Sequence, residues 1–478
     1  KGILSQHKEE NVKNDLYLYN QAHRKLAALE LRMRIRGENK EYYKEKRLEY
    51  ILEKEKTESK LRQEISFGEL IKEFKFESII IPENAVCAEY FAYYNFNTNR
   101  FMTSVSNEET YEESYSYFVF ILGQDRTRTK ILDMSSILLD ETVEKEMNCF
   151  LDATEDFWGY GETELEKIFK HFYSLFASLV MKYAQEKETI YLGLDFMLQI
   201  LPMDLIFYDR KKKPINLIYV DSVRYIEEDA MIDVMGSDAL IMGNPQYNIQ
   251  SEQQIPALLY SEIECKEIAK LFETEAYVGK MAKQKILWEN YQQNVIHIST
   301  HGNLVVKETP FKDELFINSY IMMAGYEDWC NKSKHSAYGN GIVTGDDFLF
   351  MDLSQTGLVV LSACISGLGV PKDLESLHGM RWAIGTAGAR NSVTSLWSVS
   401  DCVTAILMII FYRNLKVMSV GKSLHEAKKC LRTLTIEKMK KDEVLWRIAG
   451  DIVPNTVNQN YRPFTNWRYW AGFVCYCR

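Results

Sequence analysis

The sequence lacks any apolar run long enough to cross a lipid bilayer. A membrane-spanning helix needs about 20 consecutive apolar residues, whereas the longest candidates, such as AILMIIFY at residues 405–412, fit the buried face of a helix. The first residues also lack the basic, apolar and small pattern of a secretory signal. We therefore predict a cytoplasmic protein with no membrane partner. Because the chain starts at Lys1, we expect a native segment upstream of it.

The cysteines lack the spacing of a disulfide framework. There are nine, an odd number, spread along the whole chain, which is typical of free thiols in a reducing compartment. Cys475 and Cys477 form a C-x-C pair, but no second pair accompanies it. A structural zinc ion takes about four ligands, so the pair predicts two strand residues and no metal.

Excess positive charge and glycine-rich phosphate loops are missing as well. The net charge is −10 and the pI about 5.5, which argues against a chain-wide nucleic-acid binder. Neither G-x-G-x-x-G nor G-x-x-x-x-G-K-[ST] follows a predicted strand, which disfavours a nucleotide-binding protein. We expect no cofactor and no direct nucleic-acid partner. The 478 residues, 46% hydrophobic and 26% charged, are typical of a globular chain with two or three domains.

Three segments differ in pattern. Residues 1–62 are rich in Lys, Arg and Glu at helical spacing and predict a charged helical segment. Their spacing of small and apolar residues would also suit one end of a helical repeat array, although a single copy cannot establish a repeat. Residues 63–236 mix strands, expected near 85–96, 114–125, 191–207 and 215–226, with a helix near 164–185. No reactive cluster stands out in this second segment.

Residues 237–478 have the most regular order. Apolar strands are expected at 239–245, 294–299, 358–363 and 390–397, and helices at 261–273, 375–388 and 400–416, the last capped by Ser400 or Asp401. Apolar strands that alternate with helices predict an α/β fold with a mostly parallel sheet and helices on both faces. In such sheets the chemistry lies at the carboxyl ends of the strands.

Two of these strand ends carry reactive side chains next to glycines. His301 ends the run NVIHISTHG, and Cys364 ends LVVLSAC. Parallel neighbouring strands would bring both to one edge of the sheet. An imidazole can accept the proton of a thiol near neutral pH, and the resulting thiolate is a nucleophile. The two residues together predict a cysteine-histidine dyad.

Less specific interpretations remain for each residue. A single cysteine after an apolar strand is usually a small buried hydrophobe, and a single histidine at a strand end is usually a hydrogen-bonded polar residue. His297 and His301 would suit a metal on a helix, but on a strand they lie about 13 Å apart, too far to share an ion. His297 is therefore expected to be a strand residue.

Residues from about 70 to the C-terminus resemble the CHAT domain family of caspase-like cysteine peptidases, which is often associated with tetratricopeptide repeats. The similarity rests on these stretches: PMDLIFYD, IMGNPQY, SEIECKEIAKLF, HISTHGN, LSACISGLG, AGARNSVTSLWSVSD and NWRYWAGFVCY. The last departs from the commoner His-Pro-x-x-Trp of the family, and Ser366 stands where Thr is usual. The resemblance implies a caspase-like fold in which residues 237–478 are the active peptidase subdomain and 63–236 a degenerate caspase-like subdomain.

The resemblance also implies roles for individual residues. Cys364 would be the nucleophile and His301 the general base, with the N–H groups of Gly302 and Cys364 as the oxyanion hole. The substrate-binding candidates are Trp397, Ser398, Val399 and Asp401, although Trp397 also suits the core and Asp401 a helix cap. The polar span from Leu304 to Gly357 is expected to be irregular, outside the core, and an activation or lid loop.

The function implied is cleavage of a specific protein partner in bacterial defence or stress response. Activation would come from a protein or complex that binds through the N-terminal helical region. The alternative is a catalytically silent caspase-like scaffold that binds a partner protein.

Overall fold

The computed structural model describes residues 14–15, 18–19, 21–22, 25–26, 29, 40–64, 79, 81–95, 114–125, 128–138, 141–155, 162–208, 215–223, 226, 232, 236, 238–249, 252, 254–304, 319–330, 341–364, 379–453 and 458–477. The chain divides into two compact units. Unit 1 contains residues 1–74, 231–368 and 378–475, and unit 2 contains residues 75–230, 369–377 and 476–478.

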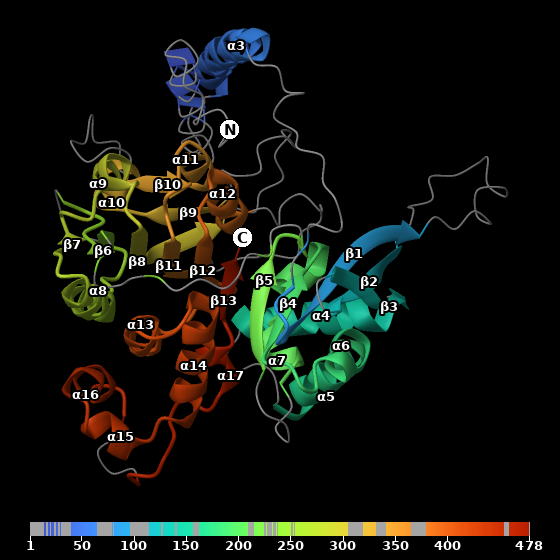
Figure 1. Cartoon of the computed structure of the whole chain (residues 1–478). Helices are drawn as coiled ribbons and strands as arrows, with labels where there is room; N and C mark the ends of the chain where they lie inside the picture. The colour runs from blue at the N-terminus through green and yellow to red at the C-terminus, as the bar shows by residue number, and fades with distance from the viewer. Residues whose placement is uncertain are drawn as a thin grey trace. The chain divides into compact units, whose positions relative to one another are not determined.

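Unit 2 is built on a mixed sheet with the strand order β5-β4-β1-β2-β3 (Figure 1). Its strands are β1 (Ala85–Asn95), β2 (Ser114–Asp125), β3 (Arg128–Leu138), β4 (Thr189–Gly193) and β5 (Asn216–Val220). β1 runs parallel to β4 but antiparallel to β2, and β2 runs antiparallel to β3. The expected strand over residues 114–125 is confirmed with the same bounds.

The helices of unit 2 correct one expectation from the sequence. They are α4 (Glu141–Glu155), α5 (Glu162–Phe172), α6 (Ser178–Tyr183) and α7 (Met203–Ile206), with a π-helical turn at Tyr173–Ala177 and a 3₁₀ helix at Phe196–Ile200. The expectation that 191–207 would be strand is wrong beyond β4. Pro202 has no N–H for a ladder, and its carbonyl accepts the N–H groups of Leu205 and Ile206 in a helical turn.

Unit 1 is built on a mostly parallel sheet with the order β10-β9-β8-β11-β12-β13, with β6 beside β8 and β7 beside β6 (Figure 1). The strands are β6 (Ala239–Pro245), β7 (Ala276–Gly279), β8 (Val295–Leu304), β9 (Ser319–Met322), β10 (Ile342–Thr344), β11 (Leu358–Cys364), β12 (Asn391–Ser395) and β13 (Phe473–Cys477). β8 is parallel to both β6 and β11, while β9 is antiparallel to β8 and β10. The α/β fold with a mostly parallel sheet is therefore confirmed.

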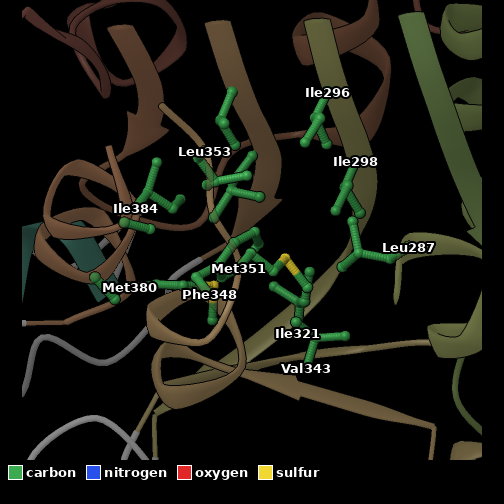
Figure 2. Packing of buried hydrophobic residues seen from close by; sticks show 14 of the residues in the cluster. Leu287, Ile296, Ile298, Ile321, Val343, Phe348, Met351, Leu353, Met380 and Ile384 are labelled. Carbon is green, nitrogen blue, oxygen red and sulfur yellow. The ribbon is translucent and has the colours of Figure 1, made fainter. Parts of the chain in front are cut away.

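Helices cover both faces of this sheet. On one face, α9 (Gln284–Asn290), α11 (Gly345–Leu349) and α12 (Met380–Ala387) contribute side chains to a large apolar core with β8 and β11. Figure 2 shows Ile296 and Ile298 of β8 in this core, to which Phe348 of α11 and Ile384 of α12 also belong. Since strand residues alternate between faces, His297 and Ser299 belong to the opposite face.

On the opposite face lie α8 (Leu259–Leu271) and α13 (Asp401–Leu415). Here the core contains a buried polar group rather than apolar side chains alone. The Tyr412 hydroxyl forms a hydrogen bond with His297 Nδ1 across 3.2 Å, and Ser299 Oγ donates to Glu264 across 3.2 Å. His297 Nε2 lies 3.0 Å from Glu264 Oε1 but is not aligned with it for a hydrogen bond. Buried polar groups of this kind fix the position of a helix on a sheet because each needs its partner.

Unit 1 contains further helices among the described residues. They are α3 (Lys40–Glu64), α10 (Tyr326–Cys330), α14 (Val420–Thr433), α15 (Ile436–Lys440), α16 (Glu443–Ala449) and α17 (Trp467–Trp470). Lys25 forms an ion pair with Glu53 of α3 across 2.9 Å. Among the described residues, no helix is both long enough and apolar enough to cross a membrane.

The described parts of the Leu304–Gly357 span contradict the expectation of an irregular surface loop. They form β9, α10, β10 and α11, and Ile321, Val343 and Phe348 are fully buried in the core (Figure 2). The apolar stretches SYIMM and IVT alternate with polar ones, so the composition of the whole span conceals them. Residues 305–318 and 331–340 lie outside the described residues.

The buried polar group on β8 leads to a prediction for stability. Tyr412→Phe removes the hydroxyl that satisfies His297 Nδ1. A buried polar atom that loses its hydrogen-bond partner costs about 1–3 kcal/mol, so the free energy of unfolding in a denaturant titration should fall by that amount. Tyr461→Phe, at a half-exposed tyrosine, is the control and should change it by less than about 0.5 kcal/mol. An equal loss in both variants would contradict the prediction.

Candidate active site

The register between β8 and β11 places His301 directly beside Cys364. The two strands pair in parallel from Val295 with Leu358 through to His301 with Cys364. Neighbouring strands lie about 4.8 Å apart, and paired positions belong to the same face of the sheet. Two residues separated by 62 others in the sequence are thus neighbours at the backbone level. The side chain of Cys364 and residues 365–378 lie outside the described part of the structure.

The pairing of β8 changes partner at the same point. His301 is its last residue paired with β11, and Gly302 is its first residue paired with β9, opposite Ile321. β8 therefore continues three residues past the histidine as strand instead of ending there. The result is a histidine at the point where the parallel part of the sheet ends and an antiparallel part begins.

The His301 ring is oriented by a backbone carbonyl that the sequence did not indicate. His301 Nε2 lies 3.0 Å from the carbonyl oxygen of Pro256. A carbonyl oxygen can only accept a hydrogen bond, so Nε2 carries the proton. In the neutral ring Nδ1 is then the nitrogen that can accept a proton, which is the state a general base requires.

Tyr247 is a second neighbour of His301 and contacts both its ring and its backbone. Its ring lies 5.5 Å from the His301 ring, and its hydroxyl oxygen accepts the N–H of His301 across 3.3 Å. The Tyr247 hydroxyl is also 3.1 Å from Thr300 Oγ1, which in turn donates to the carbonyl of Met322. Since the Thr300 proton is used there, Tyr247 donates to Thr300. The tyrosine is fully buried and holds the backbone of β8 at the histidine.

His297 lies on the same strand but serves the core. It is fully buried beside Tyr412 and Glu264, as described above. The expectation that it would be an ordinary strand residue is confirmed. Its partners hold it in the face of the sheet that α8 and α13 cover.

The substrate-binding candidates after β12 occupy different environments. Trp397 is buried, and its indole N–H donates to the carbonyl of Arg468 across 3.1 Å while its ring packs edge-on against Trp467. Ser398 is exposed and Val399 is half-buried. Of these three residues, the structure offers Ser398 and Val399 to solvent and places Trp397 in the core.

Asp401 lies in the first turn of α13, where Ser400 is the N-cap residue. Its carboxylate is used by another helix, because Oδ2 accepts the N–H of Tyr260 in the first turn of α8 across 3.1 Å. The N–H of Leu258, just before α8, donates to Asn244 Oδ1 across 2.9 Å. Asn244 and Asp401 together satisfy N–H groups at the start of α8. These N–H groups have no backbone acceptor within the helix, because no helical turn precedes them.

Three of the other cysteines, Cys265, Cys475 and Cys477, are buried thiols. Cys475 and Cys477 are buried free thiols in β13, as expected for strand residues. Burial raises the pKa of Cys265 well above the usual range, and the Glu264 carboxylate raises it further. A thiol with a raised pKa is a poor nucleophile at neutral pH.

Comparison with known proteins identifies one family. Residues 166–478 match the CHAT domain. Crystal structures of the Saccharomyces cerevisiae separase–securin complex, at 3.0 and 2.6 Å resolution, contain a similar chain with 8% sequence identity and TM-scores of 0.43 and 0.42. Each match covers 82% of this chain and 30% of the other. No curated protein matches the chain by sequence.

The environment of Asp401 predicts a pH-dependent contribution to stability. Burial raises its pKa to about 6 against the opposing N–H of Tyr260, and Glu264 adds to the rise, whereas an unfolded aspartate titrates near about 3.9. The protonated form therefore stabilises the fold below about pH 4, and this contribution is lost as the pH rises through about 6. The difference in unfolding free energy between wild type and Asp401→Asn should thus favour wild type more at pH 4 than at pH 7.5. Equal differences at both pH values would refute this.

Proposed function

Because the chain belongs to the CHAT domain family, we propose that it is a cysteine endopeptidase that cleaves a protein partner through Cys364 and His301. The observation that carries the proposal is the strand register that pairs these two residues. The Pro256 carbonyl adds to it, since it leaves His301 Nδ1 as the proton acceptor. Both features suit proton transfer from a thiol.

The first half of the proposed reaction transfers the acyl group to the enzyme. His301 Nδ1 removes the proton of the Cys364 thiol, and the thiolate attacks the carbonyl carbon of the scissile peptide bond. A C–S bond forms and the carbonyl oxygen becomes an oxyanion. The tetrahedral intermediate collapses when His301 returns the proton to the leaving amine, the C–N bond breaks, and a thioester remains on Cys364.

The second half releases the product. His301 takes a proton from water, and the hydroxide oxygen attacks the thioester carbon to form a second tetrahedral intermediate. When this intermediate collapses, the C–S bond breaks, His301 returns the proton to the sulfur, and the products are a carboxylic acid and the free thiol. The Nε2–H···O=C bond to Pro256 would be strongest while the ring is a cation, because charged donors form stronger hydrogen bonds. The carbonyl therefore stabilises the imidazolium that forms in each half-reaction.

Backbone groups and the segment after β12 complete the proposed site. The N–H groups of Gly302 and Cys364 are the proposed oxyanion hole. Ser398 and Val399 are the proposed contacts for the substrate backbone. They follow β12, which is the neighbour of β11 on the side away from β8, and Ser398 is exposed while Val399 is half-buried. Trp397 is proposed to support that segment from the core.

We further propose that cleavage is switched on by a partner, in a bacterial defence or stress response. The N-terminal helical region, which includes α3, is the proposed contact for the activating protein. α3 is highly charged along its 25 residues and has no apolar stripe to bury, so it is suited to a polar, reversible contact.

The dyad predicts the outcome of two substitutions. Cys364→Ala and His301→Ala should each lower the rate of substrate cleavage at least about 1,000-fold, because the two residues act as a unit. The measurement is a cleavage profile by mass spectrometry of candidate substrate proteins incubated with each variant. Cys430→Ala, at an exposed cysteine of α14, is the matched control and should cleave as wild type does.

Cleavage by Cys364→Ala at the wild-type rate would refute the peptidase assignment. Binding of a partner protein by wild type and by both variants, with no cleavage by any of them, would instead identify the silent scaffold.

Activation by a partner predicts low activity of the isolated chain. Purified protein should cleave its substrate slowly, and an extract from cells that contain the partner should increase the rate by at least about tenfold, which corresponds to about 1.4 kcal/mol in the activation barrier. Gel analysis of a substrate found by the cleavage profile measures this. Full processing by the purified chain, with no increase from the extract, would refute the requirement for a partner.

A further inference from the structure

We propose that Glu327, in the first turn of α10, is a positioning residue that determines which nitrogen of His301 carries the proton. Glu327 is far from His301 in sequence and belongs to the span that the sequence suggested as a loop. The effect on cleavage rests on the proposed function, whereas the effect on the ring can be measured without it.

The Glu327 carboxylate binds the backbone of the segment that approaches His301. It accepts the N–H of Gln254 at both oxygens, across 2.8 and 3.0 Å, and the N–H of Ile255 across 2.5 Å. Glu327 itself is only 6% exposed. Hydrogen bonds to a buried carboxylate are stronger than those between neutral groups, so these two peptide groups are held firmly.

The next residue along that segment is Pro256, whose carbonyl accepts from His301 Nε2. Because peptide units are planar, fixing two successive N–H groups leaves few torsions by which the following carbonyl can move. The side chain of Ile255 also packs against the cluster of Tyr247, Tyr320, Met322, Tyr326 and Ile342. Pro256 is itself exposed, so the position of its carbonyl depends on the residues on either side of it. Leu258 is held by Asn244 on one side, and Gln254 and Ile255 are held by Glu327 on the other.

The same turn of α10 also holds Tyr247, the second neighbour of His301. The N–H of Glu327 donates to the carbonyl of Tyr247 across 2.8 Å, and Asp328 Oδ2 accepts the N–H of Ile249 across 2.8 Å. The residues that carry the Tyr247 side chain and the Pro256 carbonyl, which both contact His301, are thus hydrogen-bonded, directly or through their neighbours, to the first turn of α10.

α10 provides a firm base for these contacts. Tyr326 and Tyr320 are joined through their hydroxyls at 3.1 Å, and burial raises the pKa of Tyr326 well above its usual range. The N–H of Met323 donates to the carbonyl of Gly341 across 2.7 Å. A Cβ at Gly341 would lie 2.5 Å from the backbone nitrogen of Tyr326, so only glycine permits this approach.

These contacts make the tautomer of His301 depend on Glu327. With the Pro256 carbonyl in place, the proton is held on Nε2 and Nδ1 is the acceptor. If the carbonyl moves away, the Nδ1–H tautomer gains population, and a ring in that state cannot take a thiol proton at Nδ1. The described contacts of the Glu327 carboxylate are with the N–H groups of Gln254 and Ile255, so the carboxylate acts on the ring through residues 254–256.

The test is the tautomer of His301 in protein labelled with ¹⁵N-histidine, observed at pH 8.5 by long-range ¹⁵N–¹H correlation. The His301 signals are assigned by their loss in His301→Gln. Wild type should show the Nε2–H form. Glu327→Gln removes the negative charge and replaces one of the two acceptor oxygens with an NH₂ group, which weakens the hydrogen bonds from Gln254 and Ile255, so this variant should show an increased share of the Nδ1–H form. The matched control is Asp442→Asn, since the Asp442 carboxylate also accepts backbone N–H groups, those of Val444 and Leu445, but has no link to His301.

A second measurement concerns turnover of the substrate. Glu327→Gln should lower kcat about ten- to a hundredfold, as small displacements of reacting groups do, while KM changes less than twofold because Glu327 is not a substrate contact. Asp442→Asn should leave both parameters within about twofold of wild type.

An unchanged His301 tautomer in folded Glu327→Gln would overturn the proposal, whatever the rate of cleavage. A changed tautomer supports it even if wild type cleaves no protein, in which case only the proposed function fails. Should Glu327→Gln not fold, Glu327→Asp keeps the charge but retracts the carboxylate by one methylene, and the same comparison of tautomers applies.

Discussion

The parallel register between β8 and β11 is the constraint on which the candidate site depends. It pairs seven successive positions and ends with His301 beside Cys364. A shift of one residue would move Val359 and Leu361 of β11 away from the face on which they join the apolar core. The core that Ile296, Ile298 and Leu361 help to form therefore favours this register, and the register places His301 beside Cys364. In this unit the packing of the core and the placement of the reactive residues have the same cause.

Around this register the site is assembled mainly from backbone groups. The ring of His301 is oriented by a carbonyl, its N–H is bound by Tyr247, and the segment carrying the carbonyl is held through N–H groups by a buried carboxylate. Side-chain oxygens also accept backbone N–H groups on the other face of the sheet, where Asp401 and Asn244 bind the start of α8. Buried carboxylates and amides thus place segments whose own sequences carry no reactive side chain.

The sequence was sufficient for the elements with strong local patterns and for the placement of His301 beside Cys364. The strands at residues 114–125 and 239–245 were predicted with the bounds that the structure has, because alternation or continuous apolar character marks them clearly. Residues 191–207 were misjudged because Pro202 starts a helical turn inside an apolar run, and residues 304–357 because short buried strands are interspersed with polar residues. Pro256 could not be found, since every residue has a carbonyl. Glu327 gave no signal either, because its partners are main-chain N–H groups that no side-chain pattern specifies.

The central claim is that His301 and Cys364 form one chemical unit, and the most direct measurement of it needs no substrate. The rate at which Cys364 reacts with iodoacetamide is followed across pH by mass spectrometry of its peptide, in wild type and in His301→Ala, with the exposed Cys430 as an internal reference. An isolated thiol titrates near about pH 8.5, and an adjacent imidazolium lowers that value. We predict that Cys364 in wild type becomes reactive well below this pH and that His301→Ala shifts its profile upward while Cys430 does not change. Superimposable profiles for Cys364 in the two proteins would contradict the account.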